Sequence, residues 1–400
     1  MYQAQNFKLG SAAALLTKAR ALSGKDLKQD AVKTAKQALE MLKESKNTRG
    51  EAAALALLAE VHASTKKYED ALRVANEMLG LYEGGQDVEC EGRALLLVAR
   101  VRLQMGEYED AKDMAQKAAE SYHLAGHQRG KARGCATLAE ACLAAEDTDA
   151  CWQYMQESLE LSRDSQWTEG EAQIINQLAV AHMSLGNHEE GTYIAMEGVD
   201  LCRKSGYQKQ LGNILCSVAT ANMNRLFSGA ATEQLLNWKA RVAGKEALDI
   251  FRALGYKQGI VMALNVLAYA FLEHGNYLEA KSKAKEAVEL CQQMGDKVGE
   301  GMNLLLIAQT RFADNKEEAV RLAKLAEKII KESGNAEMSK EAAEIVDSFR
   351  DEDTSKGKGA AKPSLDVQSE KTDYTLDMEF CKTRMIFFDG FIARALRTRA

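Results

Sequence analysis

An alanine that returns every 40 residues constrains this chain more than any other feature of its sequence. The positions are Ala19, Ala59, Ala99, Ala139, Ala179 and Ala219, followed by Ala268 after 49 residues and Ala308 after another 40. A period of about 20 to 50 residues is typical of arrays in which each repeat is one supersecondary unit stacked on the next. The spacing therefore predicts a repeat protein that is interrupted once, between Ala219 and Ala268.

A second ladder of small residues follows about twelve residues behind the first. Its members are Ala31, Ala71, Ala111, Cys151, Gly191, Ala240, Ala280 and Ala319. Apolar residues recur with helical spacing around the first ladder, as in residues 54–62 and 174–182, and glycines such as Gly186 and Gly275 separate the two ladders. Each period thus predicts two helices and two turns, with small residues that let the helix axes approach closely.

The composition favours helices throughout. The chain has 1 proline, Pro363, where average usage would give about twenty. Its 46% of apolar and 28% of charged residues exclude collagen-like and wholly disordered classes. No apolar run approaches the roughly eighteen residues of a membrane-spanning helix, and a net charge of −6 gives no general reason to bind nucleic acid. Because the 8 cysteines form no CxxC pair, reduced thiols and a cytoplasmic location are expected.

Two stretches resemble the tetratricopeptide (TPR) repeat. They are LLAEVHASTKKYEDALRVANEML in residues 57–79 and VLAYAFLEHGNYLEAKSKAKEAVEL in residues 266–290. The 40-residue period, and boundaries such as GDKVGEG in residues 295–301, are similar to the longer-linker TPRs of kinesin light chains and Pins-type G-protein signalling modulators. The family's tryptophan and inter-repeat proline are absent, and alanine replaces its usual ladder glycine.

The resemblance covers about residues 10–350 and implies an all-α fold. We expect a right-handed superhelical α-solenoid of about eight TPR-like helix pairs, forming one domain over residues 1–350. Nine extra residues enter between Ala219 and Ala268 and predict a helix-turn extension at residues 226–238. The apolar side chains of this extension either pack on one another or contact a partner. They are Leu226, Phe227, Leu235, Leu236 and Trp238.

The sequence offers no pattern that indicates catalysis. It has no P-loop, no HExxH, no dinucleotide-binding context and no zinc-type cysteine spacing. Cys135, Cys142 and Cys151 occupy positions where the repeat needs compact apolar groups, so packing explains them. His62 and His182 lie three periods apart and are interpreted as core or rim rings. We therefore expect neither an enzyme nor a bound cofactor or metal.

The resemblance also implies where a ligand would bind, because TPR relatives use inward positions of their first helices on either side of the ladder residue. Towards the N-terminus these positions hold Arg93, Arg100 and Arg133. Further along they hold mainly amides and methionines: Gln173, Asn176, Met183, Asn213, Cys216, Thr220, Met223, Met262, Asn265, Tyr269, Met302 and Gln309. Amides offer a peptide main chain both a donor and an acceptor, and methionines adapt to varied side chains. A second interpretation of the same side chains is packing between adjacent first helices.

The composition changes after residue 350. Residues 351–373 combine charges, small side chains and the single proline, which predicts a flexible linker. Residues 374–400 then concentrate aromatic and basic side chains, among them Tyr374, Phe380, Phe387, Phe388, Phe391 and Arg394. Three uses of this segment remain open: binding another protein, folding back into the groove of the solenoid, or lying on an anionic membrane.

These features favour a non-enzymatic scaffold or adaptor that binds peptide segments of protein partners in its concave groove, with intramolecular regulation by the C-terminal segment as one of its three open uses. The alternative is a regulatory sensor whose concave cavity binds a small ligand, which a closed pocket with converging charges would favour. Neither nucleic-acid binding nor stable membrane insertion is expected.

Overall fold

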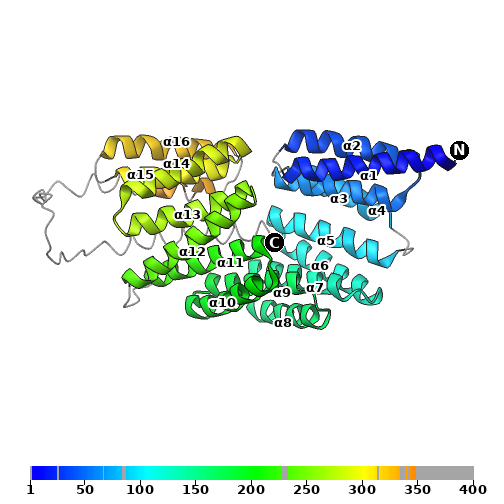
Figure 1. Ribbon diagram of the computed structural model, residues 1–400, viewed down its shortest axis with the longest axis horizontal. Coiled ribbons are helices and arrows are strands. Elements are labelled where there is room, and N and C mark those ends of the chain that lie inside the picture. The colour runs from blue at the N-terminus through cyan, green and yellow to red at the C-terminus, as the bar shows by residue number, and fades with distance from the viewer. Residues whose placement is uncertain are drawn as a thin grey trace, which may run out of the picture. The chain divides into compact units, whose positions relative to one another are not determined.

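The structure is a computed structural model and describes residues 2–24, 27–65, 67–82, 87–227, 233–312, 315–333, 338–340 and 342–347. All regular secondary structure in these ranges is helical. The helices are α1 (Tyr2–Gly24), α2 (Lys28–Glu44), α3 (Thr48–Ser64), α4 (Tyr68–Gly80), α5 (Val88–Met105), α6 (Tyr108–Leu124), α7 (Gln128–Ala144), α8 (Thr148–Asp164), α9 (Thr168–Ser184), α10 (His188–Ser205), α11 (Gln208–Phe227), α12 (Glu233–Ala253), α13 (Lys257–Glu273), α14 (Tyr277–Met294), α15 (Lys297–Arg311) and α16 (Lys316–Glu332) (Figure 1). These described helices form eight consecutive pairs, the all-α arrangement that the period predicts.

The helices belong to two compact units that divide within α9, between Leu178 and Ala179. Unit 1 contains α1 to α8 and the first part of α9, and unit 2 contains the rest of α9 and the helices after it. Within each unit, first helices of successive pairs contact one another: α1 with α3, α3 with α5, α5 with α7, α11 with α13 and α13 with α15 (Figure 1). The first helices therefore form a closely spaced layer in each unit.

Both ladders of small residues are buried. The first ladder, from Ala19 to Ala308, has 0% exposed surface at each of its positions. Gly191 of the second ladder shows the reason, because a Cβ added there would lie 2.9 Å from the backbone oxygen of Ala179 and 2.9 Å from Cγ of Met183. The two ladders thus meet where the two helices of a pair cross. The 40-residue period arises because the same close contact between helices recurs in each repeat.

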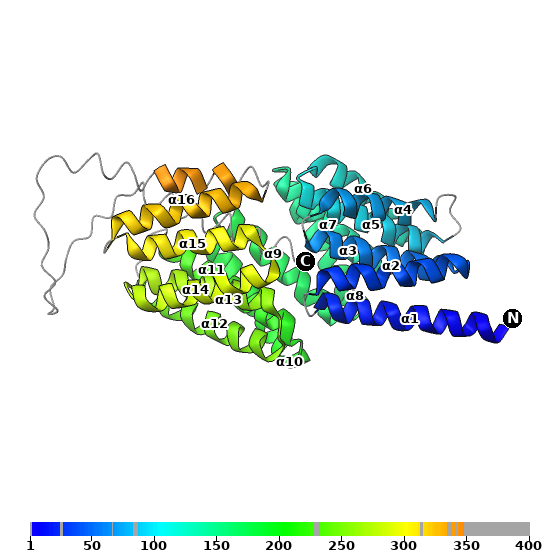
Figure 2. The same ribbon diagram turned by 90° about the horizontal axis from the view of Figure 1, so that it is seen from above.

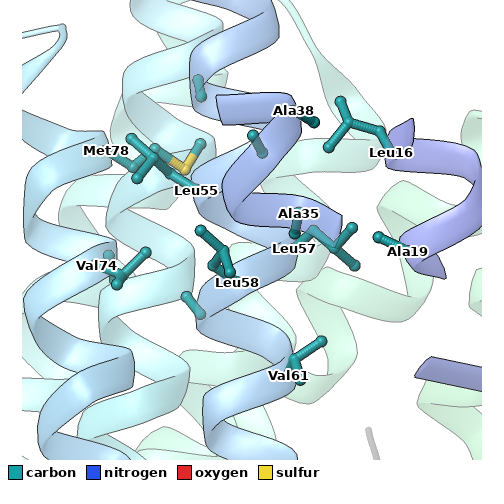
Figure 3. Packing of buried hydrophobic residues seen from close by; sticks show 14 of the residues in the cluster. Leu16, Ala19, Ala35, Ala38, Leu55, Leu57, Leu58, Val61, Val74 and Met78 are labelled. Carbon is teal, nitrogen blue, oxygen red and sulfur yellow. The ribbon is translucent and has the colours of Figure 1, made fainter. Parts of the chain in front are cut away.

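Larger apolar side chains fill the remaining space between helices. In unit 1, Leu55 and Leu58 of α3 are 1% and 2% exposed and belong to the same core cluster as Val74 and Met78 of α4. Figure 3 shows Leu55 beside Met78. Full burial of one such side chain contributes roughly 1.5–3 kcal/mol. The stability of the array is consequently a sum of such contacts between neighbours.

Two devices recur at the turns. Helix α5 begins after Asp87, whose side chain accepts a hydrogen bond of 3.2 Å from the backbone N–H three residues later. The same helix ends at Gly106, which has a left-handed backbone with a φ of 84°. Three residues other than glycine hold a similar backbone conformation: Lys46 with φ 54°, Glu146 with φ 64° and Gln166 with φ 50°.

The interruption of the lattice coincides with two long helices. Helix α11 has 20 residues and α12 has 21, whereas α13 has 17. Asn237, near the start of α12, donates a hydrogen bond of 2.7 Å to the backbone oxygen of Ala270 in α13. Leu236 is buried, whereas Leu235 and Trp238 are 46% and 53% exposed. No helix in the described part of the chain is both long enough and apolar enough to span a bilayer.

Candidate functional site

Three first helices of unit 1 frame a cleft of about 380 Å³. The helices are α3, α5 and α7, which contact one another in that order (Figure 2). The cleft is lined by Ala56, Glu60, Glu89, Cys90, Arg93, Leu96, Leu97, Arg100, Tyr122, His127, Arg129, Gly130, Arg133 and Trp167. Because helical residues three or four apart share a face, Glu89, Arg93, Leu96 and Arg100 all reach the cleft from one side of α5.

Four exposed arginines dominate the cleft: Arg93, Arg100, Arg129 and Arg133. The guanidinium carbon of Arg133 lies 4.8 Å from the ring centroid of Trp167, a cation–π contact of about 0.5–1 kcal/mol at an exposed site. Arg129 donates a hydrogen bond of 3.4 Å to the backbone oxygen of Ser165. Within the described residues, Arg93, Arg129 and Arg133 form no ion pair with a carboxylate.

A histidine links the two walls of the cleft. His127 caps α7, because its Nδ1 accepts a hydrogen bond of 2.9 Å from the backbone N–H of Gly130. The proton of the neutral ring is then on Nε2, which lies 3.8 Å from Oε1 of Glu89 on α5. The histidine therefore directs an N–H towards one of the two carboxylates of the cleft, the other being Glu60.

Tyr122 forms part of the base of the cleft. The residue is 6% exposed, and its ring centroid lies 5.5 Å from that of His127. Gly130 makes this packing possible, because a Cβ there would lie 2.2 Å from the tyrosine ring. Burial raises the pKa of Tyr122 to about 12, although the charges of Arg93 and Arg133 act in the opposite direction. The phenol is consequently neutral at physiological pH.

The structure brings together three of the site residues predicted from the sequence, namely Arg93, Arg100 and Arg133. Sequence reasoning missed Arg129, His127 and Trp167. His127 and Trp167 each stand twelve residues before a ladder alanine, the position that Asp87 occupies in the preceding repeat. Tyr207 and Tyr256 hold the same position in later repeats, so a ring there does not by itself mark the cleft.

The remaining predicted residues are less accessible. Gln173 and Asn176, in the unit 1 part of α9, are half-buried, as is Asn213 of α11. The others are less than 10% exposed: Met183, Cys216, Thr220, Met223, Met262, Asn265, Tyr269, Met302 and Gln309. Thr220 donates a hydrogen bond of 2.9 Å to the backbone oxygen of Cys216 in its own helix. Peptide binding by this set stays a prediction.

Asn265 differs from the other residues of this buried set. It is 2% exposed, and neither its amide nitrogen nor its amide oxygen has a hydrogen-bond partner. Leaving a buried polar group unpaired costs about 1–3 kcal/mol. Helix α13 thus holds a buried amide whose donor and acceptor are both unused.

Other predictions concern metals and the C-terminal segment. Among the residues that the structure describes, no three His, Cys, Asp or Glu side chains gather as a metal ion requires. The predicted linker of residues 351–373 lies outside the described residues, as do Tyr374, Phe380, Phe387, Phe388, Phe391 and Arg394.

Helix pairs with the 40-residue period, and first helices that form one layer in each unit, define an α-solenoid of TPR-like repeats. Three solved structures are similar in fold. A Rap protein complexed with Competence and Sporulation Factor has a TM-score of 0.52 at 13% identity, covering 87% of this chain and 99% of that one. A signal transduction ATPase of the STAND type with a tetratricopeptide repeat sensor, from Pyrococcus horikoshii, has a TM-score of 0.54 at 16% identity, covering 82% and 50%. The apo form of RapI has a TM-score of 0.50 at 15% identity, covering 71% and 99%.

At these identities the likeness concerns the fold alone. This chain spans about half the length of the STAND protein. No protein-family model matches the chain, and no curated protein matches its sequence. The TPR-like fold is confirmed, whereas the narrower resemblance to kinesin light chains and Pins-type modulators stays a prediction.

Proposed function

We propose that this chain is a protein-interaction module that binds a segment of a partner protein on its first helices. The observation that carries the proposal is the unit 1 cleft, where Arg93, Arg129 and Arg133 form no ion pair among the described residues and Arg133 lies over the ring of Trp167. Arginine and tryptophan are among the residues in which the binding energy of protein interfaces concentrates. The Rap protein of similar fold is complexed with Competence and Sporulation Factor, which supports a ligand-binding role for such an array.

Two of the cleft arginines are already held in place. A segment that enters the cleft meets Arg133 over the Trp167 ring and Arg129 hydrogen-bonded to the backbone oxygen of Ser165, so these two side chains need little ordering on binding. In unit 2, the buried amide of Asn265 has an unused donor and acceptor, and a peptide main chain that enters between the first helices would bond to both. A scaffold or adaptor role in the cytoplasm, using residues 374–400 for a second contact or for self-regulation, is the extended form of this proposal.

A displayed library of random peptides, panned against the intact chain, tests the function directly. Asn265→Ala is expected to reduce capture of the selected peptides at least tenfold with little change in melting temperature, because the amide has no partner to lose. Asn303→Ala is the matched control, since Asn303 is also 2% exposed but donates a hydrogen bond of 2.9 Å to the backbone oxygen of Gly299. A chain that ends at residue 373 shows whether the segment after it competes with the peptides.

Two results would contradict the proposal. If the library yields no peptide that is enriched on this chain compared with an unrelated helical protein, the proposed peptide-binding function is wrong. Loss of folding in the Asn265→Ala variant would instead assign that amide to the packing of α13.

The alternative function is a sensor of a small ligand. The volume of the cleft, about 380 Å³, lies within the range of roughly 300–1,000 Å³ that is common for small-molecule sites, and four arginines line it. A thermal-shift screen with small anions and peptides separates the two functions. Stabilisation by small anions alone would favour the sensor.

A further inference from the structure

The cleft of unit 1 has an excess of positive charge. Four guanidiniums line it, against the two carboxylates of Glu60 and Glu89, and three of the four, those of Arg93, Arg129 and Arg133, form no ion pair among the described residues. The chain as a whole has a net charge of −6. A cationic cleft in an acidic protein attracts an anion of matching size, and low-dielectric walls focus that attraction.

The arginines of the cleft also differ from others in the same unit. Arg49 pairs with Asp87 at 2.9 Å, Arg73 with Asp70 at 3.2 Å and Arg163 with Glu171 at 2.8 Å. Arg102, two residues after Arg100, contacts both Glu107 and Asp110. In the described chain, carboxylates thus compensate arginines around the cleft but not Arg93, Arg129 or Arg133 within it.

These arginines reach the cleft from two neighbouring helices. Arg129 and Arg133 are one turn apart on α7, and Arg93 lies on α5, which contacts α7. All three line the same cleft. The Trp167 ring holds the guanidinium of Arg133 on one face, which leaves the N–H groups at the edge of the guanidinium plane to bind a ligand.

We propose that this cleft binds a phosphate monoester, carried by a phosphorylated serine or threonine of the partner segment. The inference rests on the proposed function, because it names the chemistry of the segment that the same cleft takes. A phosphate monoester carries about −1.5 to −2 charges at pH 7 and three acceptor oxygens, which suits three guanidiniums that have no carboxylate partner among the described residues. A single carboxylate offers less charge and fewer acceptor oxygens.

Three immobilised pools of degenerate peptides test the inference, with phosphoserine, glutamate or serine fixed at the central position. The intact chain is expected to bind the phosphoserine pool at least tenfold more tightly than the glutamate or serine pool. Free O-phosphoserine and inorganic phosphate serve as competitors, and only the former carries a monoester. Retention should fall with rising salt, because the cleft arginines are exposed.

Substitutions in the chain assign the effect to the cleft. Arg93→Gln and Arg133→Gln are each expected to weaken binding to the phosphoserine pool at least tenfold, while Arg73→Gln, in the same unit but outside the cleft, leaves it unchanged. All three arginines are exposed, so thermal melting should be similar for the three variants. A lysine variant, Arg93→Lys, keeps the charge but not the fork and is expected to bind more weakly than the unmodified chain.

The outcomes separate this inference from the proposed function. Equal retention on the phosphoserine and glutamate pools, or unchanged binding in Arg93→Gln and Arg133→Gln, would overturn the phosphate assignment while peptide binding stands. No retention on any pool and no competition would overturn both. Stabilisation of the chain by O-phosphoserine without retention on a peptide pool would support the monoester site and contradict the peptide function.

Discussion

A single added methyl group tests how closely the helices must approach. A Cβ at Gly134 of α7 would lie 2.9 Å from Cβ, 3.0 Å from Cα and 3.1 Å from the backbone nitrogen of Ala119 in α6. Because two of these atoms belong to the backbone, no change of rotamer relieves the contact, and the helices must separate. Overpacking of this kind costs about 1–3 kcal/mol, and the better helix propensity of alanine offsets about 1 kcal/mol. Gly134→Ala is therefore expected to lower stability by up to about 2 kcal/mol.

The matched control is Gly10→Ala in α1, where an added Cβ meets no atom within 4 Å. This variant should gain about 0.5–1 kcal/mol from helix propensity alone. The difference between the two variants isolates the cost of the close approach, about 1–3 kcal/mol. Urea unfolding followed by circular dichroism and by the intrinsic fluorescence of the three tryptophans, Trp152, Trp167 and Trp238, measures both. If Gly134→Ala stabilises the chain as much as Gly10→Ala does, the account of helix packing is wrong.

Two other predictions concern titratable groups. Burial lowers the pKa of His62 and His188 below the usual 6.5. Below that pH the unfolded chain therefore binds more protons than the folded one, and stability falls as the pH drops. His188→Gln should reduce the difference between the urea midpoints at pH 7 and pH 5, and an unchanged difference would contradict this. Burial raises the pKa of Cys135 to about 12 and of Cys202 to about 11. Iodoacetamide at pH 8 should therefore modify the half-buried Cys90 before either of these two thiols in the native chain. Mass spectrometry of timed samples measures the order of modification.

The fold follows from the sequence because the repeat places the same physical requirement at regular intervals. Ala139 and its counterparts are spaced at 40 residues because each sits at a helix crossing where a larger side chain would push the pair apart. Such a requirement is visible without coordinates. The division into two units is not visible, because α9 runs through the boundary as an uninterrupted helix.

The site was predictable only in part. Arg93, Arg100 and Arg133 were found from their register on first helices, and the cleft contains all three. The register of a residue on a first helix does not distinguish an inward side chain that a ligand can reach from one that packs between neighbouring first helices. Both kinds of side chain lie on the same face of the helix. Met262 and Asn265 occupy inward positions of α13, whose residues from 259 to 270 are all buried. The contribution of Trp167 depends on the turn before α9, which periodicity does not describe.

At Lys46, Glu146 and Gln166 a residue other than glycine has a left-handed backbone conformation, so the sequence at these turns is not the most stable one available. Glycine adopts this backbone without steric cost, whereas another residue pays roughly 1–2 kcal/mol for it. Most mutations destabilise a protein, and selection removes only those that lower its stability below what its function requires. Replacing Lys46 or Glu146 by glycine is accordingly expected to make the array more stable. Gln166 directly precedes Trp167, so a glycine at position 166 would also increase the backbone mobility of the residue that lines the cleft.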